Sequence, residues 1–295
     1  MVRRHRVVKA LWSNVGVTGE REGNRMNGVV QSVVQVRHRP GAIGAAFTPA
    51  DVEQFRHDGF LIVRGLADAA SCERMLAVAH RHLEASMAPV EYEADTQYPG
   101  APATLDAPGG RTVRRLLQAY ARDPLFRDWV HAEALVTRLE QLLEAPVALS
   151  QVHHNCVMTK QPAFSSVTGW HQDIRYWSYS QPDLVSVWLA LGPEHVDNGC
   201  LFVVPGSHRM VFGPDQYDEA QFFRADTDQN RAVLACQTPV ELEPGDVLFF
   251  HARLLHAAGR NHTDRTKFAA AFTFHASNNR PVAGTRSASL PDVAI

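Results

Sequence analysis

From Pro146 onward, the chain becomes a series of short apolar runs that are rich in Val, Leu and Phe. Gly, Pro, Asn and Asp residues separate these runs, which read VALSQVHHNCVMTK, DLVSVWLAL, CLFVVP, AVLACQTP, GDVLFFH and KFAAAFTFH. Short strands divided by turn residues are typical of a sandwich or barrel. The second half of the chain is therefore predicted to form an antiparallel β core.

Helical patterns precede this core. Thr48 suits an N-cap and Pro49 the first helical position, so a helix is predicted to begin there and to end at Asp58-Gly59. The following FLIVRG is predicted to be a buried strand. Further helices are predicted over residues 68–85, 112–121 and 123–143. Residues 88–112 contain several prolines and are predicted to form a loop long enough to act as a lid or pocket wall. The chain is thus expected to be mainly β with flanking α-helices.

The charge balance limits the range of functions. The 295 residues include 29 basic and 31 acidic ones, which gives a formal net charge of −2. A general nucleic-acid binder usually has a marked basic excess, so no nucleic-acid partner is predicted. The chain has no apolar run of about 18 residues, and no membrane span is predicted.

The termini and the cysteines indicate a cytoplasmic protein. Residues 1–46 have no helical periodicity and no apolar segment of the secretory type, so they are predicted to be a poorly ordered extension. Residues 47–295 are then predicted to be a single domain. The four cysteines are scattered without a C-x-x-C pair, and they are expected to be reduced thiols, mostly buried: Cys72, Cys156, Cys200 and Cys236.

The segment TGWHQDIRYW holds the residues most suited to chemistry. On an extended strand, His171 and Asp173 would project to the same face and could bind one metal ion. A third ligand is sought in GDVLFFHARLLHAAGRN, where His256 directly precedes a turn and His251 is the other histidine. Two histidines and one carboxylate form the facial triad of non-haem Fe(II) oxygenases, which leaves coordination positions open. The H-x-D pair alone is weak evidence for a metal site, because a chain with 15 histidines can contain such a pair by chance.

Four segments together carry a more specific signal. They are TPADVEQFRHDGFLIVRG, WHQD at 170–173, DNGCLFVVPGSHR at 197–209 and GDVLFFHARLLHAAGRN at 245–261. In this combination the sequence resembles the phytanoyl-CoA dioxygenase family, which includes ectoine hydroxylase. The resemblance covers residues 47–276. It implies a double-stranded β-helix, the cupin-like jelly roll, with flanking helices.

The resemblance also implies a cofactor set and a reaction. Fe(II) would be bound by His171, Asp173 and His256, and 2-oxoglutarate and O2 would serve to hydroxylate an aliphatic C–H bond with release of succinate and CO2. The substrate would be a small molecule or lipid-like. The presence of the Asp173 carboxylate favours hydroxylation over halogenation, whereas desaturation, cyclisation and epimerisation stay open.

Other positions acquire expected roles from the same resemblance. The family's usual arginine for the distal carboxylate of 2-oxoglutarate is replaced here by Lys267, and Arg265, expected on the same strand face, is the alternative cation. Trp188 is expected near the co-substrate, and Tyr176 and Trp177 near the substrate. His251 is expected to be structural.

Two other functions fit the same residues. One is a cupin-like enzyme that uses another metal for non-oxidative chemistry, and the other is a non-catalytic binding protein of the same fold. The cation at Lys267 argues against the first, and the complete triad against the second. The sequence identifies neither the substrate nor the oligomeric state.

Overall fold

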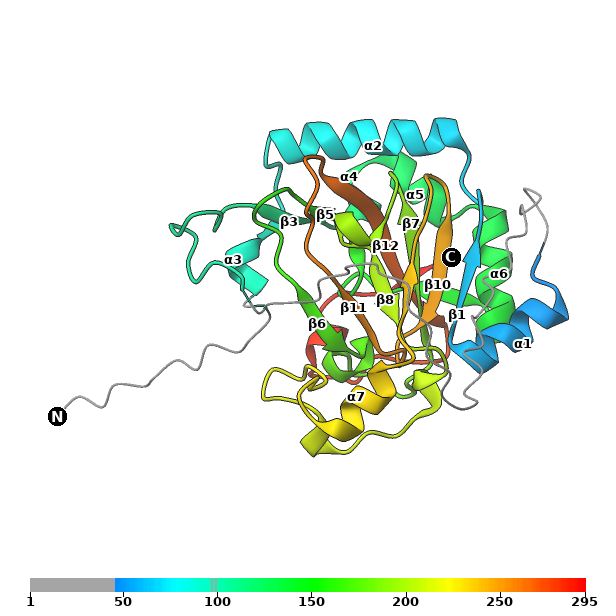
Figure 1. Cartoon of the computed structure of the whole chain (residues 1–295). Coiled ribbons are helices and arrows are strands. Elements are labelled where there is room, and N and C mark those ends of the chain that lie inside the picture. The colour runs from blue at the N-terminus through cyan, green and yellow to red at the C-terminus, as the bar shows by residue number, and fades with distance from the viewer. Residues whose placement is uncertain (1–45, 97, 99) are drawn as a thin grey trace, which may run out of the picture. The chain divides into compact units, whose positions relative to one another are not determined.

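The computed structural model describes residues 46–96, 98 and 100–295 (Figure 1). The predicted N-terminal extension, residues 1–46, lies outside the described residues except for its last position. The α-helices are α1 Pro49–Asp58, α2 Ala69–Glu84, α3 Glu93–Thr96, α4 Ala119–Arg122, α5 Pro124–Val130, α6 Glu133–Leu143 and α7 Asp228–Leu234. The strands are β1 Phe60–Val63, β2 Val90–Tyr92, β3 Val113–Leu117, β4 Val147–Leu149, β5 Asn155–Lys160, β6 Thr168–His171, β7 Leu184–Ala190, β8 Leu201–Val203, β9 Thr238–Val240, β10 Val247–His251, β11 His256–Ala258, β12 Lys267–Ala276 and β13 Val293–Ala294.

The strands form two sheets in which every pairing is antiparallel. The larger sheet runs β1-β10-β7-β12-β5-β3-β2, with β4 and β13 attached, and the smaller runs β6-β11-β8-β9. From β5 to β12 the chain moves back and forth between the two sheets. This winding is that of a double-stranded β-helix, so the predicted cupin-like fold class is confirmed, although the described strands do not close into a barrel.

Side-chain alternation along the large sheet separates two cores. On β7, Val187 and Leu189 join the cluster that packs against the helices, whereas Trp188 joins the cluster between the sheets. On β12, Phe268 faces the helices and Ala269 faces the space between the sheets. Helices α2, α5 and α6 contribute buried side chains to the outer cluster, and α2 lies along the upper edge in Figure 1. The inner space between the sheets is thereby left for the polar residues of the site.

The first helix begins and ends where the sequence predicts. Asp51 N donates to Thr48 Oγ1 at 3.2 Å, and Thr48 N donates to Asp51 Oδ2 at 2.9 Å, which completes a capping box. Pro49 occupies the first turn, where no N–H donor is needed. Gly59 ends the helix with a φ of +81°, a conformation that favours glycine.

The predicted helix over residues 112–121 is wrong. Residues 113–117 form strand β3, which pairs with β5 through Arg115 opposite Met158 and Leu116 opposite Val157. Within the predicted range, the short helix α4 is the one helical segment after β3. The single helix predicted over residues 123–143 is divided into α5 and α6. The local sequence suits a helix, but pairing with a strand distant in sequence overrides that preference.

Three further differences concern short segments. Residues 88–112, predicted to be a loop, contain β2 and α3. The AVLACQTP run, predicted to be a strand, contributes to α7 and then to β9. The VALSQVHHNCVMTK run is divided into β4 and β5.

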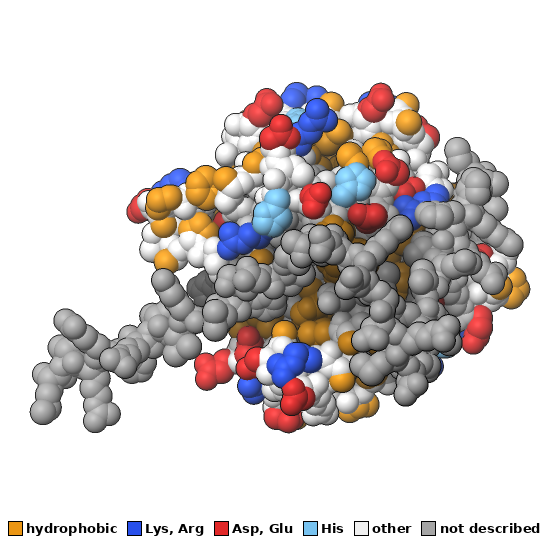
Figure 2. All heavy atoms as spheres, viewed as in Figure 1, with side chains coloured by type: hydrophobic (Ala, Val, Ile, Leu, Met, Phe, Trp, Pro, Cys, Tyr) orange, Lys and Arg blue, Asp and Glu red, His pale blue; other side chains and the backbone are white. Residues whose placement is uncertain are grey.

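The remaining sequence predictions concern surfaces and thiols. No helix in the described ranges has the length and apolar character that crossing a bilayer requires. Figure 2 shows acidic and basic side chains interspersed on the face in view. All four cysteines are free and three are buried. Burial raises the pKa of Cys72 and Cys156 to about 11, which keeps both thiols protonated.

Candidate active site

Two histidines face each other across the small sheet. His171 is the last residue of β6 and His256 the first residue of β11, and the two are register partners in this antiparallel pair. Their ring centroids are 4.2 Å apart, and both residues are buried. Cross-strand pairing thus brings together two side chains that are far apart in sequence.

Backbone carbonyl groups fix the orientation of both rings. His171 Nδ1 lies 2.8 Å from the carbonyl oxygen of Gly169, and His256 Nδ1 lies 2.9 Å from that of Leu254. A carbonyl accepts but does not donate, so the proton is on Nδ1 and Nε2 is left as a lone-pair donor. Burial, and then His171, lowers the pKa of His256 to about 4, which keeps this imidazole neutral and able to bind a metal.

Asp173 is the third residue that lies beside these two histidines. Its Oδ1 atom lies 3.5 Å from His171 Nε2 and 3.8 Å from His256 Nε2. Burial alone would raise the pKa of Asp173, but His154, His256 and His171 outweigh it and hold the pKa below its usual value. The carboxylate is therefore ionised.

These three residues fit a divalent metal ion. One ligand atom from each lies within 4.8 Å of the others, and all three residues are buried. Two ligand atoms that each lie about 2.1 Å from one ion are at most about 4.2 Å apart, which the two carboxylate distances satisfy. Asp173 Oδ2 is buried and has no hydrogen-bond partner within the described part of the chain. A buried carboxylate oxygen without a donor is costly, and a bound cation would remove that cost.

The local backbone differs from the one predicted. The expectation was that His171 and Asp173 share one extended strand, but β6 ends at His171, and Asp173 begins the 3₁₀ turn η1 Asp173–Tyr176. Gln172 between them is extended, with φ of −116° and ψ of 125°, so the two side chains still project to one side. Ile174 N donates to the carbonyl of Ala252 at 3.0 Å, which fixes the turn against the segment before β11.

His251 lies at the end of β10 in the other sheet. Its Nε2 is 3.3 Å from Asp183 Oδ1, and its Nδ1 accepts from the backbone N of Arg253 at 3.0 Å. These contacts hold the turn that leads into β11 and agree with the structural role expected for this residue.

A cavity opens from the triad into the space between the sheets. It is lined by residues from both sheets and from the segment before β3, namely Tyr98, Arg114, Arg115, His154, Met158, Thr159, Lys160, Thr168, His171, Trp188, Leu201, Phe250, His256, Ala258 and Lys267. Four of these are cations, and one of them, Lys160, has no carboxylate partner among the described residues, so the cavity suits an anionic ligand.

Lys267 lines this cavity, and the carboxylate of Glu194 neutralises its charge. Its Nζ atom lies 2.7 Å from Glu194 Oε2, and both side chains are almost completely buried. The other carboxylate oxygen of Glu194 accepts from Trp188 Nε1 at 2.7 Å. The Lys267 ammonium also lies 5.0 Å from the centroid of the Trp188 ring. The structure thus brings together Lys267 and Trp188, the two residues expected at the co-substrate.

Arg265 lies elsewhere. It was expected to share a strand face with Lys267, but β12 begins at Lys267, and Arg265 lies in the preceding turn with an exposed side chain. The Asn261 side-chain amide donates to the Arg265 carbonyl at 2.7 Å, which stabilises that turn. The i, i+2 argument fails here because the two residues do not belong to one strand.

The two aromatic residues after the H-x-D pair contact different histidines. The Tyr176 ring centroid is 6.2 Å from that of His171, and its hydroxyl donates to the carbonyl of Ala220 at 2.9 Å. Trp177 stacks on His153 at 4.6 Å and meets His154 edge-on at 5.4 Å. Tyr176 thus has a ring contact with a triad histidine, whereas Trp177 contacts the two adjacent histidines at 153–154.

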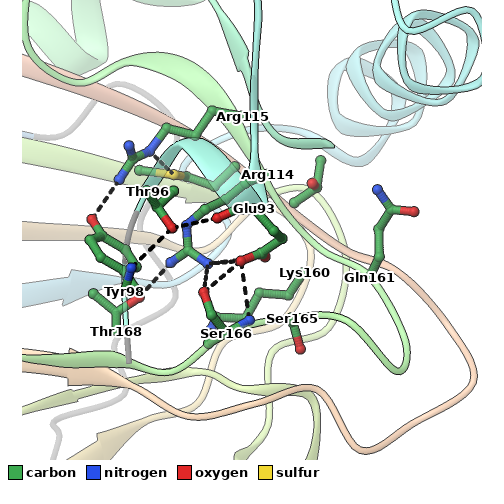
Figure 3. Close-up of polar contacts among 12 residues, drawn as sticks. Glu93, Thr96, Tyr98, Arg114, Arg115, Lys160, Gln161, Ser165, Ser166 and Thr168 are labelled. Carbon is green, nitrogen blue, oxygen red and sulfur yellow. Dashed lines mark hydrogen bonds and ion pairs between the residues drawn. The ribbon is translucent and has the colours of Figure 1, made fainter. Parts of the chain in front are cut away.

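A second polar cluster holds β6 in place (Figure 3). Arg114 on β3 pairs with the buried Glu93 at 3.1 Å, and its other terminal nitrogen donates to Thr168 Oγ1 at 2.6 Å. The Arg114 guanidinium also lies over the Tyr98 ring at 4.6 Å. Thr168 is the first residue of β6, so this ion pair positions the strand that carries His171.

The sequence gives no clear sign of three residues that the structure places at the site. Lys160 is the last residue of β5, the strand before the H-x-D pair, but its inward direction depends on the register of β5 with β12. Glu194 is 73 residues from Lys267 and becomes recognisable only through that contact. His154 Nδ1 lies 3.8 Å from Asp173 Oδ2. In the sequence, His154 is recognisable only as one of two adjacent histidines, and that spacing does not identify a metal ligand.

Comparison with known proteins agrees with this geometry. A sequence profile of the phytanoyl-CoA dioxygenase family matches residues 55–269, which include the triad and Lys267. The chain belongs to the phytanoyl-CoA dioxygenase family. The resemblance predicted from the sequence motifs is confirmed.

Individual relatives show the same likeness. A Caenorhabditis elegans protein named as a probable phytanoyl-CoA dioxygenase is 30% identical over 175 residues, which is 55% of this chain and 54% of that protein. The chain thus spans about half the length of that relative. An ectoine dioxygenase of Streptomyces avermitilis is 27% identical over 259 residues and is matched over 82% of both chains. The crystal structure of the non-haem α-ketoglutarate-dependent epimerase SnoN from nogalamycin biosynthesis is 25% identical, with a TM-score of 0.64 over 82% of this chain and 89% of SnoN.

Family and site together define the enzyme class. The chain is a non-haem dioxygenase that depends on iron and 2-oxoglutarate. The predicted cofactor set of Fe(II), 2-oxoglutarate and O2 agrees with the two-histidine, one-carboxylate donor set and with the cationic cavity beside it.

Proposed function

We propose that this phytanoyl-CoA dioxygenase family member hydroxylates an aliphatic C–H bond of a small-molecule or lipid-like substrate. In the proposed reaction, O2 contributes one oxygen atom to the product and one to succinate, and 2-oxoglutarate loses CO2. The observation that carries the proposal is the convergence of His171, Asp173 and His256 at the end of a buried cavity lined by cations.

His171, Asp173 and His256 would hold Fe(II). When bound, this ion supplies the redox chemistry that couples O2 and 2-oxoglutarate to C–H oxidation. The carbonyls of Gly169 and Leu254 hold the protons of both imidazoles on Nδ1, which directs each Nε2 to the metal. All three ligands come from one side, so positions for a chelating co-substrate and for O2 stay available.

The cationic end of the cavity would receive the distal carboxylate of 2-oxoglutarate. Lys160, Lys267 and Trp188 line that end of the cavity, on strands β5, β12 and β7 of the large sheet. Burial strengthens a hydrogen bond between an ammonium group and a carboxylate, because few water molecules compete for either group. The co-substrate would thus lie between the triad and this end.

The substrate would approach from the side of Tyr176 and Trp177. Trp177 is held by stacking on His153, and Tyr176 by its hydrogen bond to Ala220, so both present aromatic surface near the triad. Aromatic side chains supply contact area for apolar carbon chains and rings. Asp173 provides a carboxylate ligand, which favours hydroxylation over halogenation.

The proposal is tested by loading the protein with Fe(II) and 2-oxoglutarate without O2, and recording the visible absorption band of the chelate. O2 is then admitted, and succinate is measured together with product from a substrate panel. We expect the band and succinate from the wild type, and neither from His171→Ala. Product that has gained one oxygen atom supports hydroxylation. Product of unchanged mass with an inverted carbon centre would indicate epimerisation instead, the activity that the name of SnoN gives. Neither band nor succinate in the wild type would favour another metal or a non-catalytic role.

A further inference from the structure

The charges around the cavity are matched in pairs with one exception. Arg114 pairs with Glu93, and Lys267 pairs with Glu194. Arg115 forms an ion pair with Glu91. Lys160 is the exception. In the part of the chain that the structure describes, no carboxylate lies within the 4.0 Å ion-pair distance of its ammonium group.

The position of Lys160 directs its charge toward the co-substrate end of the cavity. It is the last residue of β5 and the register partner of Lys267 on β12, so the two side chains leave the sheet on the same face. That face belongs to the inner core, because Cys156, two strand repeats earlier, lies in the cluster between the sheets. Lys160 is 6% exposed and lines the cavity.

The contacts of the Lys160 ammonium are incomplete. It donates to the carbonyl oxygen of Ser166 at 3.1 Å and to that of Gly259. Figure 3 shows Lys160 below the Arg114–Glu93 pair and next to Ser166. An ammonium group has three N–H donors, so one donor is left over after these two carbonyls. Neutral carbonyls orient the group but do not cancel its charge.

A buried cation without a counter-ion is unfavourable. Desolvation is expensive unless an opposite charge compensates for it. Burial, together with Arg114 and Lys267, lowers the pKa of Lys160 well below its usual value. An anion beside Lys160 would remove this penalty, and the cavity is the space from which an anion can reach it.

The charges of the complete site balance when Lys160 is included. Fe(II) carries two positive charges and Asp173 one negative charge, which leaves one positive charge at the metal end. Lys160 supplies one at the other end, and 2-oxoglutarate carries one carboxylate for each. We propose that Lys160 is the residue whose charge binds the distal carboxylate of 2-oxoglutarate. In this arrangement Lys267, already matched by Glu194, shapes the end of the cavity and contributes no net charge. This inference rests on the proposed function.

Two ligands separate this role from a structural one. They are 2-oxoglutarate and 2-oxopentanoate, which has the same chain length but a methyl group in place of the distal carboxylate. Binding of both to the Fe(II)-loaded protein is measured by calorimetry without O2. For Lys160→Met we expect the Kd of 2-oxoglutarate to rise about 100-fold, as for loss of one partner of a buried charge pair. The Kd of 2-oxopentanoate should stay within about threefold, because its methyl group forms no ion pair or hydrogen bond with the lysine.

A double variant tests the rival assignment by removing the Lys267–Glu194 ion pair as a unit. Lys267→Met combined with Glu194→Gln deletes one positive and one negative charge, and Trp188 can still donate to the new amide oxygen. The Kd of 2-oxoglutarate should then change by less than about fivefold, since no unmatched charge is lost. Lys160→Gln is a second variant that keeps an N–H donor for the carbonyls. Lys160→Gln replaces Lys160→Met in the binding measurements if Lys160→Met does not bind 2-oxopentanoate, which would show that it is misfolded.

The opposite pattern overturns the proposal. Lys160→Met and Lys160→Gln with wild-type affinity for 2-oxoglutarate, together with a large loss in the double variant, would assign the carboxylate to Lys267. An equal loss of affinity for both ligands in Lys160→Gln would show that Lys160 only supports the fold. A wild-type protein that binds neither 2-oxo acid with Fe(II) present would refute the proposed function itself, a result distinct from either pattern.

Discussion

Glu93→Gln tests the ion pair that positions β6. Glu93 is 1% exposed and lies under Arg114, which is 5% exposed. Besides the arginine, the carboxylate accepts from the backbone N of Ser166 at 3.3 Å and from the hydroxyl of the same residue. The amide of glutamine keeps the shape of the side chain but removes its charge, so the Arg114 guanidinium is left buried without a counter-ion.

The structure sets the size of the expected effect. Removing one partner of a buried ion pair usually costs about 3–5 kcal/mol of unfolding free energy, because the remaining charge stays desolvated. For chains of this size, each kcal/mol lowers the melting temperature by roughly 2–4 °C. Glu93→Gln is therefore expected to melt about 10 °C below the wild type. Because Arg114 also holds Thr168 at the start of β6, the affinity for Fe(II) should fall as well.

Glu91→Gln is the matched control. Glu91 pairs with Arg115 in the same part of the sheet, but their side chains are 25% and 21% exposed. Water can solvate this pair, so the same substitution should cost only about 1 kcal/mol. Urea unfolding of both variants gives the comparison. Equal losses at the two positions would refute the reasoning, and so would a Glu93→Gln/Arg114→Met double variant that is no more stable than Glu93→Gln.

Two further predictions concern other parts of the fold. Burial and neighbouring His251 lower the pKa of His208 to about 4, below the value near 6.5 in the unfolded chain. Unfolding therefore takes up a proton between these pH values, and up to about 3 kcal/mol of stability should be lost as the pH falls from 6.5 to 4. Urea midpoints across this range should show a shallower loss in His208→Gln, and an unchanged slope would contradict the assignment. Gly199 has a φ of +78°, and a Cβ there would lie 2.7 Å from the carbonyl oxygen of Gly259, so Gly199→Ala should cost more than about 2 kcal/mol. Gly192→Ala, where a Cβ meets nothing within 4 Å, should change stability by less than about 0.5 kcal/mol in the same assay.

The sequence predicts the class of fold well because its signals are local. Capping residues around Thr48 define the first helix, and runs of Val, Leu and Phe between turn residues define the strands. The division of the GDVLFFHARLLHAAGRN segment between two sheets is not local. It depends on β10 pairing with β1 and β7, and on β11 pairing with β6 and β8.

The errors share one physical cause. Residues 113–117 adopt a strand because β5 provides a hydrogen-bonding partner, and local propensity carries no information about that partner. The wrong prediction for Arg265 also comes from a strand boundary that the local sequence does not show. An i, i+2 argument needs to know where the strand begins, and β12 begins two residues later.

Residue types, spacing and family resemblance predict the triad, but its electrostatic surroundings come only from the structure. His171 and Asp173 keep the side-by-side projection expected of them even though Asp173 lies in a 3₁₀ turn. The match between Lys267 and Glu194, and the absence of a comparable carboxylate near Lys160 among the described residues, follow from contacts between distant segments. Because of those contacts, we assign the distal carboxylate of 2-oxoglutarate to Lys160, where the sequence alone predicts Lys267.

The central claim is that His171, Asp173 and His256 hold the iron of a 2-oxoglutarate-dependent dioxygenase. The most direct measurement is the oxygen isotope content of succinate made from 2-oxoglutarate under ¹⁸O2 with Fe(II). We expect one ¹⁸O atom per succinate from the wild type and from His262→Ala, whose side chain is exposed, and no succinate from Asp173→Ala. Succinate without the label, or the same labelled yield from Asp173→Ala, would contradict this account.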